Sequence, residues 1–444
     1  MTDRAILLLA SNFPPVRGGS AVVYGNLARS LCDRVVVLAP RESYIDGLPL
    51  IGWREHDREA PYRIVRCRML RTRINSGQEG RLPKLLFVIS DLMIRLRVTS
   101  VLARMLLATG ARTICVGELL AGGWILQLCR WLPLVRSVVY VHGEEITTRN
   151  AYDPDRRRIL AALRAADRIV VVSRFTRGAV RALLGPATDA KTTLIENGLD
   201  TQRFRPLGKR ADLVALYGLA DRFVFVSVCR LVEKKGIDNT IRAFVAVRRR
   251  YRDCRYLVVG TGPYEAALRR IATEAGVAES VVFAGDVTEE DLVAHYCLGD
   301  AFVMPNRALA DGDTEGFGLV FLEANGCGLP VIAGRDGGSR DAVQDGVNGL
   351  VVDGHSVAAI EAAMLALIGD AALRARLARQ GWEVAAEADW RGRAAAFLAV
   401  CEGTSPVAPG PESREAGGVP SAQSDRTEAL KQRKDRHDEI APPC

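Results

Sequence analysis

Residues 223–250 read FVFVSVCRLVEKKGIDNTIRAFVAVRRR and pass from an apolar run into a helical pattern. The run, residues 223–229, is almost continuously apolar rather than alternating, which indicates a strand that is covered on both faces. The helical pattern, residues 236–250, follows after a short polar turn. A strand that leads directly into a helix is the repeating unit of a parallel sheet with helices on its faces.

The same unit recurs along most of the chain. We expect a first series of strands at residues 5–10, 35–39, 63–67, 113–116, 138–142, 168–173 and 193–195. We expect a second series at residues 223–229, 255–259, 281–284, 301–304, 331–333 and 350–352. Predicted helices between them include residues 20–32, 83–108, 155–166, 236–250 and 317–327. This alternation predicts an α/β protein with two doubly wound parallel sheets.

The two series are separated by a polar stretch with Gly and Pro, residues 197–208. We therefore predict one Rossmann-like domain over residues 1–200 and a second over residues 201–380. Ligands of such sheets bind beyond the carboxyl ends of the strands, so two facing sheets predict a deep cleft between the domains. Residues 403–444 are rich in Pro, Gly, Ser and charge, and we expect a disordered tail there.

The composition is typical of soluble globular proteins, with 48% hydrophobic and 25% charged residues. No run of about 18 uncharged apolar residues occurs, so we expect no transmembrane helix. The first apolar run lacks a small-residue cleavage site, which favours a buried strand over a signal peptide. The ten cysteines are scattered singly, which favours free thiols in a reducing compartment, the cytosol.

Positive charge is concentrated in the first half of the chain. Residues 1–200 carry 30 Lys and Arg against 18 Asp and Glu, whereas the whole chain has a net charge of +8. This surplus predicts an anionic partner such as a membrane surface, and the apolar, arginine-containing stretch 81–108 is compatible with a membrane-surface helix. Solvated arginines on a core helix are the alternative. No nucleic-acid-binding motif occurs, and we expect no nucleic acid partner.

The most informative segment is residues 313–330, DTEGFGLVFLEANGCGLP. Glu315 and Glu323 lie eight residues apart. If a helix begins at Phe317, then Glu315 precedes it and Glu323 lies inside it. The backbone N–H groups of Gly316, Phe317 and Gly318 then form a positive helix N-terminus, which suits oxyanions and hydroxyls. A capping acid followed by an ordinary surface glutamate is the alternative.

This segment resembles the E-x7-E signature of family 4 glycosyltransferases, which have the GT-B fold of two facing Rossmann-like domains and retain the anomeric configuration. Other segments follow the order of the family's motifs as far as about residue 400. They are NFPPVRGG (12–19), VYVHGEE (139–145), SRFTR (173–177), ENGLD (196–200), VCRLVEKKGID (228–238), VVGTGPYEAAL (258–268) and FAGDV (283–287).

The resemblance implies which residues act. The implied catalytic residues are His142, Glu315, Arg230 and Lys235. The implied donor-binding residues are Gly18, Gly19, Arg230, Lys235, Gly260, Gly262, Glu315, Gly316, Phe317, Gly318 and Glu323. The resemblance also implies that a terminal helix, residues 381–402, crosses back onto the first domain.

Arg230 and Lys235 suit the chemistry of a nucleoside diphosphate leaving group. Arginine offers a planar fork of donors and lysine a compact charge, and preorganised cations of this kind stabilise a leaving phosphate without a metal. A solvated loop is the alternative for both residues. Lys234 is a second candidate for the role of Lys235, but the spacing to the following glycine favours Lys235. Asp311 and Asp313 read as a D-x-D metal motif, but their polar loop favours a turn. We expect no metal and no other cofactor.

His142 follows a predicted strand, and we expect it to hydrogen-bond a hexose hydroxyl, although a structural histidine is the alternative. Since no residue qualifies clearly as a covalent nucleophile, we expect front-face transfer in which the leaving phosphate helps to deprotonate the acceptor.

The predicted function is retaining transfer of a hexose, with mannose favoured, from a nucleotide sugar such as GDP-mannose to a lipid-linked or glycan acceptor. The resemblance is greatest to bacterial mannosyltransferases of the phosphatidylinositol-mannoside type, which implies a cytoplasmic protein peripheral to the inner face of the membrane. A UDP-sugar donor and a nucleotide-sugar 2-epimerase-like isomerase remain alternatives. An NAD(P) oxidoreductase is disfavoured, because SNFPPVRGG follows the first strand where G-x-G-x-x-G is required.

Overall fold

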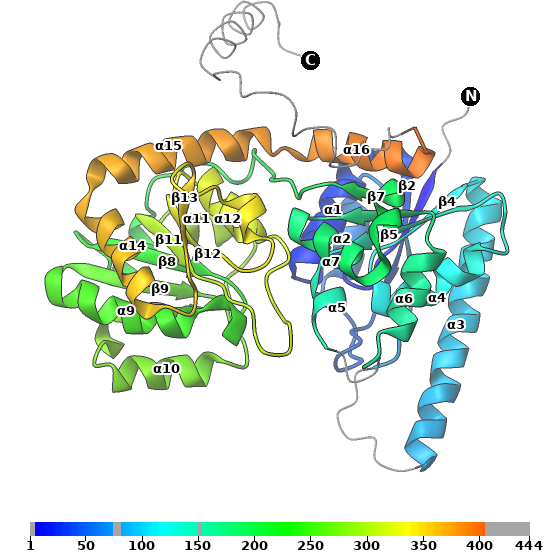
Figure 1. The fold of residues 1–444 in the computed structure, drawn as a ribbon, viewed down its shortest axis with the longest axis horizontal. Coiled ribbons are helices and arrows are strands. Elements are labelled where there is room, and N and C mark those ends of the chain that lie inside the picture. Colours follow the sequence, from blue (N-terminus) through cyan, green and yellow to red (C-terminus); the bar gives the residue numbers. More distant parts are fainter. Residues whose placement is uncertain (1–4, 74–80, 150–152, 405–444) are drawn as a thin grey trace, which may run out of the picture. The chain divides into compact units, whose positions relative to one another are not determined.

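The computed structural model describes residues 5–73, 81–149 and 153–404 (Figure 1). The predicted disordered tail, residues 403–444, lies almost wholly outside these residues. The predicted division at residue 200 and at residue 380 stays a prediction.

The first sheet has seven parallel strands in the order β3-β2-β1-β4-β5-β6-β7. The strands are β1 (Ile6–Leu9), β2 (Val35–Pro40), β3 (Arg63–Cys67), β4 (Thr113–Val116), β5 (Arg136–Val141), β6 (Arg168–Val171) and β7 (Thr192–Leu194). The order reverses between β1 and β4. Such a reversal opens a crevice at the carboxyl ends of the two strands, where ligands of doubly wound sheets bind.

The second sheet has six parallel strands in the order β10-β9-β8-β11-β12-β13 and reverses between β8 and β11. The strands are β8 (Phe223–Val228), β9 (Cys254–Val259), β10 (Val281–Gly285), β11 (Ala301–Met304), β12 (Val331–Gly334) and β13 (Gly349–Val352). The two sheets confirm the predicted fold class, and every predicted strand is present to within about two residues at each end.

Helices connect the strands of each sheet (Figure 1). In the first half they are α1 (Gly19–Leu31), α2 (Trp53–Glu59), α3 (Arg81–Thr109), α4 (Leu119–Cys129), α5 (Glu144–Thr147), α6 (Arg157–Ala165) and α7 (Arg174–Leu184). In the second half they are α8 (Ala211–Leu216), α9 (Ile237–Arg250), α10 (Glu265–Glu274), α11 (Leu292–Tyr296), α12 (Leu319–Gly326), α13 (Ser339–Ala342), α14 (Val357–Gly369), α15 (Ala371–Glu387) and α16 (Trp390–Glu402).

Both faces of β1, β2 and β4 in the first sheet are buried, as their continuous apolar runs predict, whereas the edge strand β3 is only partly buried. In β1, Ile6 and Leu8 pack into one core cluster with α1, while Leu7 and Leu9 pack into another with α3 and α4. Each fully buried side chain of this size contributes roughly 1.5–3 kcal/mol to folding. The sheets are therefore rigid platforms for the loops at their strand ends.

Two predicted helices differ from the observed ones. The E-x7-E helix begins at Leu319 rather than at Phe317, because Gly318 caps it in a left-handed conformation with φ 89°. The predicted terminal helix, residues 381–402, is the end of α15 followed by α16, with a break at Ala388–Asp389. α16 reaches the first sheet, since the carbonyl of Cys401 accepts a hydrogen bond from Thr113 Oγ1 at 2.9 Å.

No helix of the described residues is long and apolar enough to span a membrane. Nine cysteines lie in the described residues, and all nine are free thiols, eight of them buried.

Candidate active site

Loops from the carboxyl ends of the two sheets meet at His142. A Cβ atom on Gly316 would lie 2.0 Å from the carbonyl oxygen of His142, so only glycine allows this approach. A Cβ atom on Gly143 would lie 3.3 Å from Gly316 Cα, and one on Gly19 would lie 3.9 Å from Leu319 Cδ1. The E-x7-E loop therefore packs against the ends of β5 and of the β1–α1 loop, both of which belong to the first sheet.

Lys235 and Glu315 form a direct ion pair in this region. Lys235 Nζ lies 2.5 Å from Glu315 Oε2, and the two side chains are only 13% and 14% exposed. Burial raises the pKa of Glu315, but Lys235, Lys234 and Arg230 outweigh it and hold the pKa below its usual value. Glu315 is thus a carboxylate at neutral pH, with three cations around it.

Arg230 is exposed, and its side chain makes no hydrogen bond or ion pair with any residue that the structure describes. Its charge acts on Glu315 from the loop after β8. An unpaired guanidinium beside a paired lysine leaves donors free for an anionic ligand.

Gly260 and Gly262 hold the loop of Arg230 in place. A Cβ atom on Gly260 would lie 2.1 Å from the carbonyl oxygen of Cys229, and one on Gly262 would lie 2.3 Å from that of Leu231. The two glycines are therefore needed for close packing of the β8 and β9 loops. Their predicted contact with a donor stays a prediction.

Lys234 has a different role from Lys235. Its buried Nζ lies 2.7 Å from Asp313 Oδ1, 3.2 Å from Glu144 Oε2 and 3.2 Å from the carbonyl oxygen of Thr314. The second acid of the D-x-D sequence is thus bound to a lysine. In the part of the chain that is described, no cluster of His, Cys, Asp and Glu could hold a metal ion.

Glu323 lies on α12 and is buried. Tyr296 donates its hydroxyl proton to Glu323 Oε2 at 2.6 Å, and burial raises the pKa of Glu323. Lys235 is among the cations that act on it. Arg230, Lys235, Glu315 and Glu323 therefore belong to one electrostatic cluster.

His142 is held by two tyrosines. Its Nε2 lies 2.6 Å from the Tyr24 hydroxyl, and its ring stacks on Tyr140 with centroids 5.2 Å apart. Burial lowers the pKa of His142 to about 4, so the ring is neutral at pH 7. Its Nδ1 has no hydrogen-bond partner among the described residues and is free for a ligand.

Two acids that the sequence analysis did not single out fix the loops of this site. Glu145 accepts hydrogen bonds from the backbone N–H of His142 at 2.7 Å and of Gly143 at 3.0 Å. Glu118, at the end of β4, accepts in the same way from Ser11 at 2.5 Å and Asn12 at 3.0 Å. Burial raises the pKa of each acid to about 7. The sequence signal that could have identified these two acids is their position just after a buried strand, in VGE (116–118) and HGEE (142–145).

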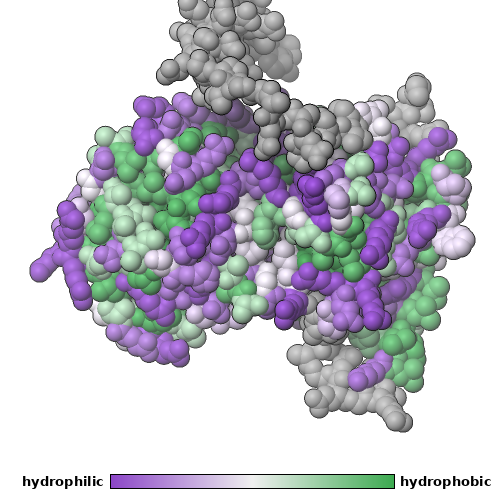
Figure 2. Space-filling view, viewed as in Figure 1, coloured by the Kyte–Doolittle hydropathy of each residue, from purple (hydrophilic) through white to green (hydrophobic). Residues whose placement is uncertain are grey.

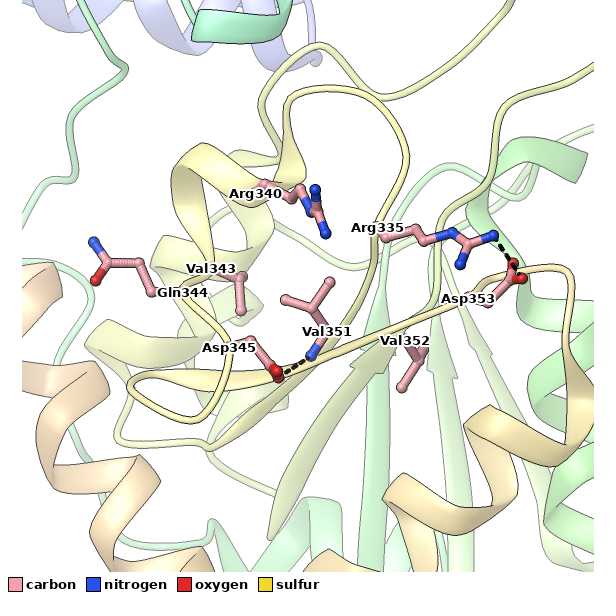
Figure 3. Close-up of a pocket in the computed structure, with 8 residues that line it drawn as sticks. All are labelled: Arg335, Arg340, Val343, Gln344, Asp345, Val351, Val352 and Asp353. Carbon is pink, nitrogen blue, oxygen red and sulfur yellow. Dashed lines mark hydrogen bonds and ion pairs between the residues drawn. The ribbon is translucent and has the colours of Figure 1, made fainter. Parts of the chain in front are cut away.

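A separate cavity of about 400 Å³ lies beside β12 and β13 and contains none of the predicted site residues (Figure 3). Arg335 and Arg340 project over Val351 in it. Arg335 is paired with Asp353 at 2.8 Å, and Asp345 accepts from the Val351 N–H. The acids balance the arginines, so this cavity has no surplus charge for an anion.

Comparisons with known proteins cover both halves of the chain. Residues 17–203 match the family Glycosyltransferase Family 4, and residues 217–384 match the family Glycosyl transferases group 1. A GDP-mannose-dependent alpha-(1-6)-phosphatidylinositol monomannoside mannosyltransferase of Mycolicibacterium smegmatis is 34% identical over 409 residues, which cover 90% of this chain and 98% of the relative. Its counterpart of the same name in Mycobacterium tuberculosis strain H37Rv is 34% identical over 377 residues, covering 82% and 89%.

Solved structures agree on the fold. HepE of Anabaena, in complex with UDP and glucose, has a TM-score of 0.70 at 20% identity, covering 90% of this chain and 100% of that one. Sucrose-phosphate synthase of Thermosynechococcus elongatus has a TM-score of 0.69 at 22% identity, covering 90% and 99%. With the mycobacterial relatives aligned over nearly their whole length, the chain belongs to glycosyltransferase family 4 and is a nucleotide-sugar-dependent glycosyltransferase with the GT-B fold.

Proposed function

We propose that this enzyme transfers mannose from GDP-mannose to a phosphatidylinositol-type glycolipid, with retention of the anomeric configuration. The names of the mycobacterial relatives support both substrates. The observation that carries the proposal is the ion pair of Lys235 and Glu315, placed where Gly316 packs on His142. Cations for a diphosphate and acceptors for sugar hydroxyls thus lie side by side.

Arg230 and Lys235 bind the diphosphate of the donor in this proposal. Arg230 has free donors, and an incoming phosphate adds a second anion beside Lys235. As the glycosidic bond breaks, negative charge grows on the leaving phosphate, and these fixed cations stabilise it. Glu323 binds the ribose, and Glu315 binds the hexose.

The hexose lies between Glu315 and His142. Neutral His142 offers Nδ1 for a hydrogen bond to a hydroxyl, because Tyr24 occupies Nε2. The hydroxyl Oγ1 of Thr314 is buried and has no hydrogen-bond partner among the described residues, which suits a ligand at this position. No carboxylate in this arrangement is assigned as a nucleophile, and the leaving phosphate assists deprotonation of the acceptor.

A lipid acceptor requires contact with a membrane, and α3 provides a suitable surface. Seven large apolar side chains in its first half are between 45% and 63% exposed: Leu85, Leu86, Val88, Ile89, Leu92, Met93 and Leu96. Figure 2 shows the corresponding hydrophobic surface at the lower right, where α3 runs in Figure 1. Lys84 and Arg97 are exposed beside them. Apolar exposure on this scale, flanked by basic residues, is typical of interfacial helices.

The substrate assignment is tested with radiolabelled donors and vesicles that contain a phosphatidylinositol mannoside. We expect labelled lipid from GDP-mannose at a rate at least about tenfold above that from UDP-glucose or UDP-N-acetylglucosamine. Labelled lipid from a UDP-sugar alone would overturn the donor, and label that never enters the lipid would overturn the acceptor.

The membrane surface is tested by vesicle flotation. We expect Leu92→Glu with Met93→Glu to weaken binding to anionic vesicles at least about tenfold. The matched control is Leu207→Glu with Leu216→Glu, which changes two exposed leucines of the second half and leaves binding intact. Equal binding by both double variants would exclude α3 as the membrane contact.

A further inference from the structure

A second large cavity, of about 1140 Å³, opens at the amino-terminal ends of the strands of the first sheet. Ile6 of β1, Thr113 of β4, Ser137 of β5 and Arg168 of β6 line it, together with Glu402 at the end of α16. His142 lies beyond the opposite end of β5. β5 has six residues and runs from the cavity to the site described above, so the two lie roughly 20 Å apart.

The cavity carries a surplus of positive charge. Among the described residues, five arginines line it, against two acids, Asp167 and Glu402. The arginines are Arg34, Arg112, Arg130, Arg136 and Arg168.

Both acids of the cavity are already engaged. Glu402 accepts a hydrogen bond from Arg34. Asp167 accepts from the Ser137 N–H and hydroxyl, each at 2.8 Å. Within the described residues, four of the five arginines therefore have no carboxylate partner.

Helix capping explains one of these four arginines and leaves the other three. Arg136 does cap α16, since it donates to the carbonyl of Cys401 at 2.8 Å. Arg112 and Arg130 are exposed, and neither side chain forms a hydrogen bond or ion pair within the described residues. Arg168 reaches only the carbonyl of Asp167, at 3.3 Å. Three guanidinium groups are therefore available to a ligand.

An apolar turn also lines the cavity. Leu132, Pro133, Leu134 and Val135 line it, and Leu134 is 73% exposed. Trp131, the neighbour of Leu132, is 83% exposed. A ligand whose anionic group binds the arginines would thus place its apolar part beside this turn between α4 and β5.

We propose that this cavity binds the phosphate of an anionic phospholipid. Arginine's planar fork pairs with phosphate oxygens in a bidentate manner, and three such groups without an ion-pair partner among the described residues line this cavity. The apolar turn accommodates the glycerol and the first acyl carbons. The site is distinct from the acceptor position at His142 and does not depend on which sugar is transferred, so it anchors the enzyme to lipid independently of catalysis.

Monomeric short-chain lipid separates this site from α3, which contacts a bilayer. Dihexanoyl phosphatidic acid and inorganic phosphate are titrated by calorimetry into the wild-type protein and into Arg112→Gln/Arg130→Gln/Arg168→Gln. The control, Arg249→Gln/Arg252→Gln/Arg379→Gln, removes the same charge from exposed positions outside the cavity. GDP affinity and the unfolding temperature check that each variant is folded, and Arg130→Glu alone replaces the triple variant if that variant is unstable.

We expect saturable binding of the lipid, weakened at least about tenfold in the cavity variant and unchanged in the control. Three results would overturn the proposal: the wild-type protein does not bind the lipid, the cavity variant binds it as well as the wild type, or inorganic phosphate binds as tightly as the lipid. The last result would indicate a site for free phosphate.

Discussion

The ion pair of Lys235 and Glu315 yields a sharp prediction for Lys235→Ala. Removing one partner of a buried pair typically costs about 3–5 kcal/mol, because the other charge stays buried without compensation. Both side chains here are nearly buried, but Lys234 and Arg230 still act on Glu315. We therefore expect the variant to lose about 2–3 kcal/mol of unfolding free energy near neutral pH, below the full cost of an isolated charge.

The loss depends on pH in a direction that the pKa of Glu315 determines. In the wild type this pKa is lowered, so Glu315 contributes stability that is present above its unfolded pKa and is lost as the pH falls through its folded pKa. Without Lys235, the largest influence that lowers the pKa of Glu315 is lost, so this pKa rises. A protonated acid needs no cation, so the destabilisation should be largest near about pH 7.5 and shrink towards about pH 5.

Urea unfolding of the wild type, Lys235→Ala, Glu315→Gln and the double variant measures this cycle. We expect the double variant to lose less than the sum of the single losses, by about 2 kcal/mol, as contacting residues do. Additive losses, or a loss in Lys235→Ala that is the same at both pH values, would show that the pair contributes nothing to the fold and would refute the reasoning.

Substitutions at four further residues test the loops and the donor site, each by steady-state kinetics with GDP binding in parallel. Gly316→Ala places a Cβ 2.0 Å from the His142 carbonyl, and we expect kcat to fall more than about tenfold with GDP affinity largely kept. Tyr24→Phe removes the hydrogen bonds of the Tyr24 hydroxyl to His142 Nε2 and to the carbonyl of Gly117, so we expect both kcat and the unfolding temperature to fall. Glu145→Gln should impair kcat less than Glu145→Ala, since the amide keeps one acceptor for the His142 loop. Glu323→Ala should weaken GDP at least about tenfold, and unchanged GDP affinity would remove the ribose assignment.

The strands were predictable because a strand buried on both faces must be apolar throughout. The start of the E-x7-E helix was not, because it depends on one backbone angle. Gly318 is left-handed, and a Cβ on it would lie 2.5 Å from the Phe321 ring, so the chain cannot become helical until Leu319.

The break before α16 depends on a contact distant in sequence. The Leu199 N–H donates to the carbonyl of Ala388 at 2.6 Å, and a Cβ on Gly198 would lie 2.9 Å from the Trp390 ring. Such a pairing leaves no trace in the helical periodicity of residues 381–402.

The partners of the predicted site residues could not be predicted from the sequence. The spacing of the charges suggested Lys235 over Lys234, and the structure places both in the cluster: one lysine binds Glu315 and the other binds Asp313. Glu118 was not singled out, since its function appears only when β4 lies beside β1 and brings it to the Ser11 and Asn12 N–H groups.

The central claim is that Arg230, Lys235, Glu315 and Glu323 hold one nucleotide-sugar donor, and calorimetric titration with GDP tests it most directly. The account predicts that the wild type and Arg249→Gln bind one GDP with equal affinity, and that Arg230→Gln weakens this binding at least about tenfold. Equal affinity of Arg230→Gln and Arg249→Gln for GDP would contradict it.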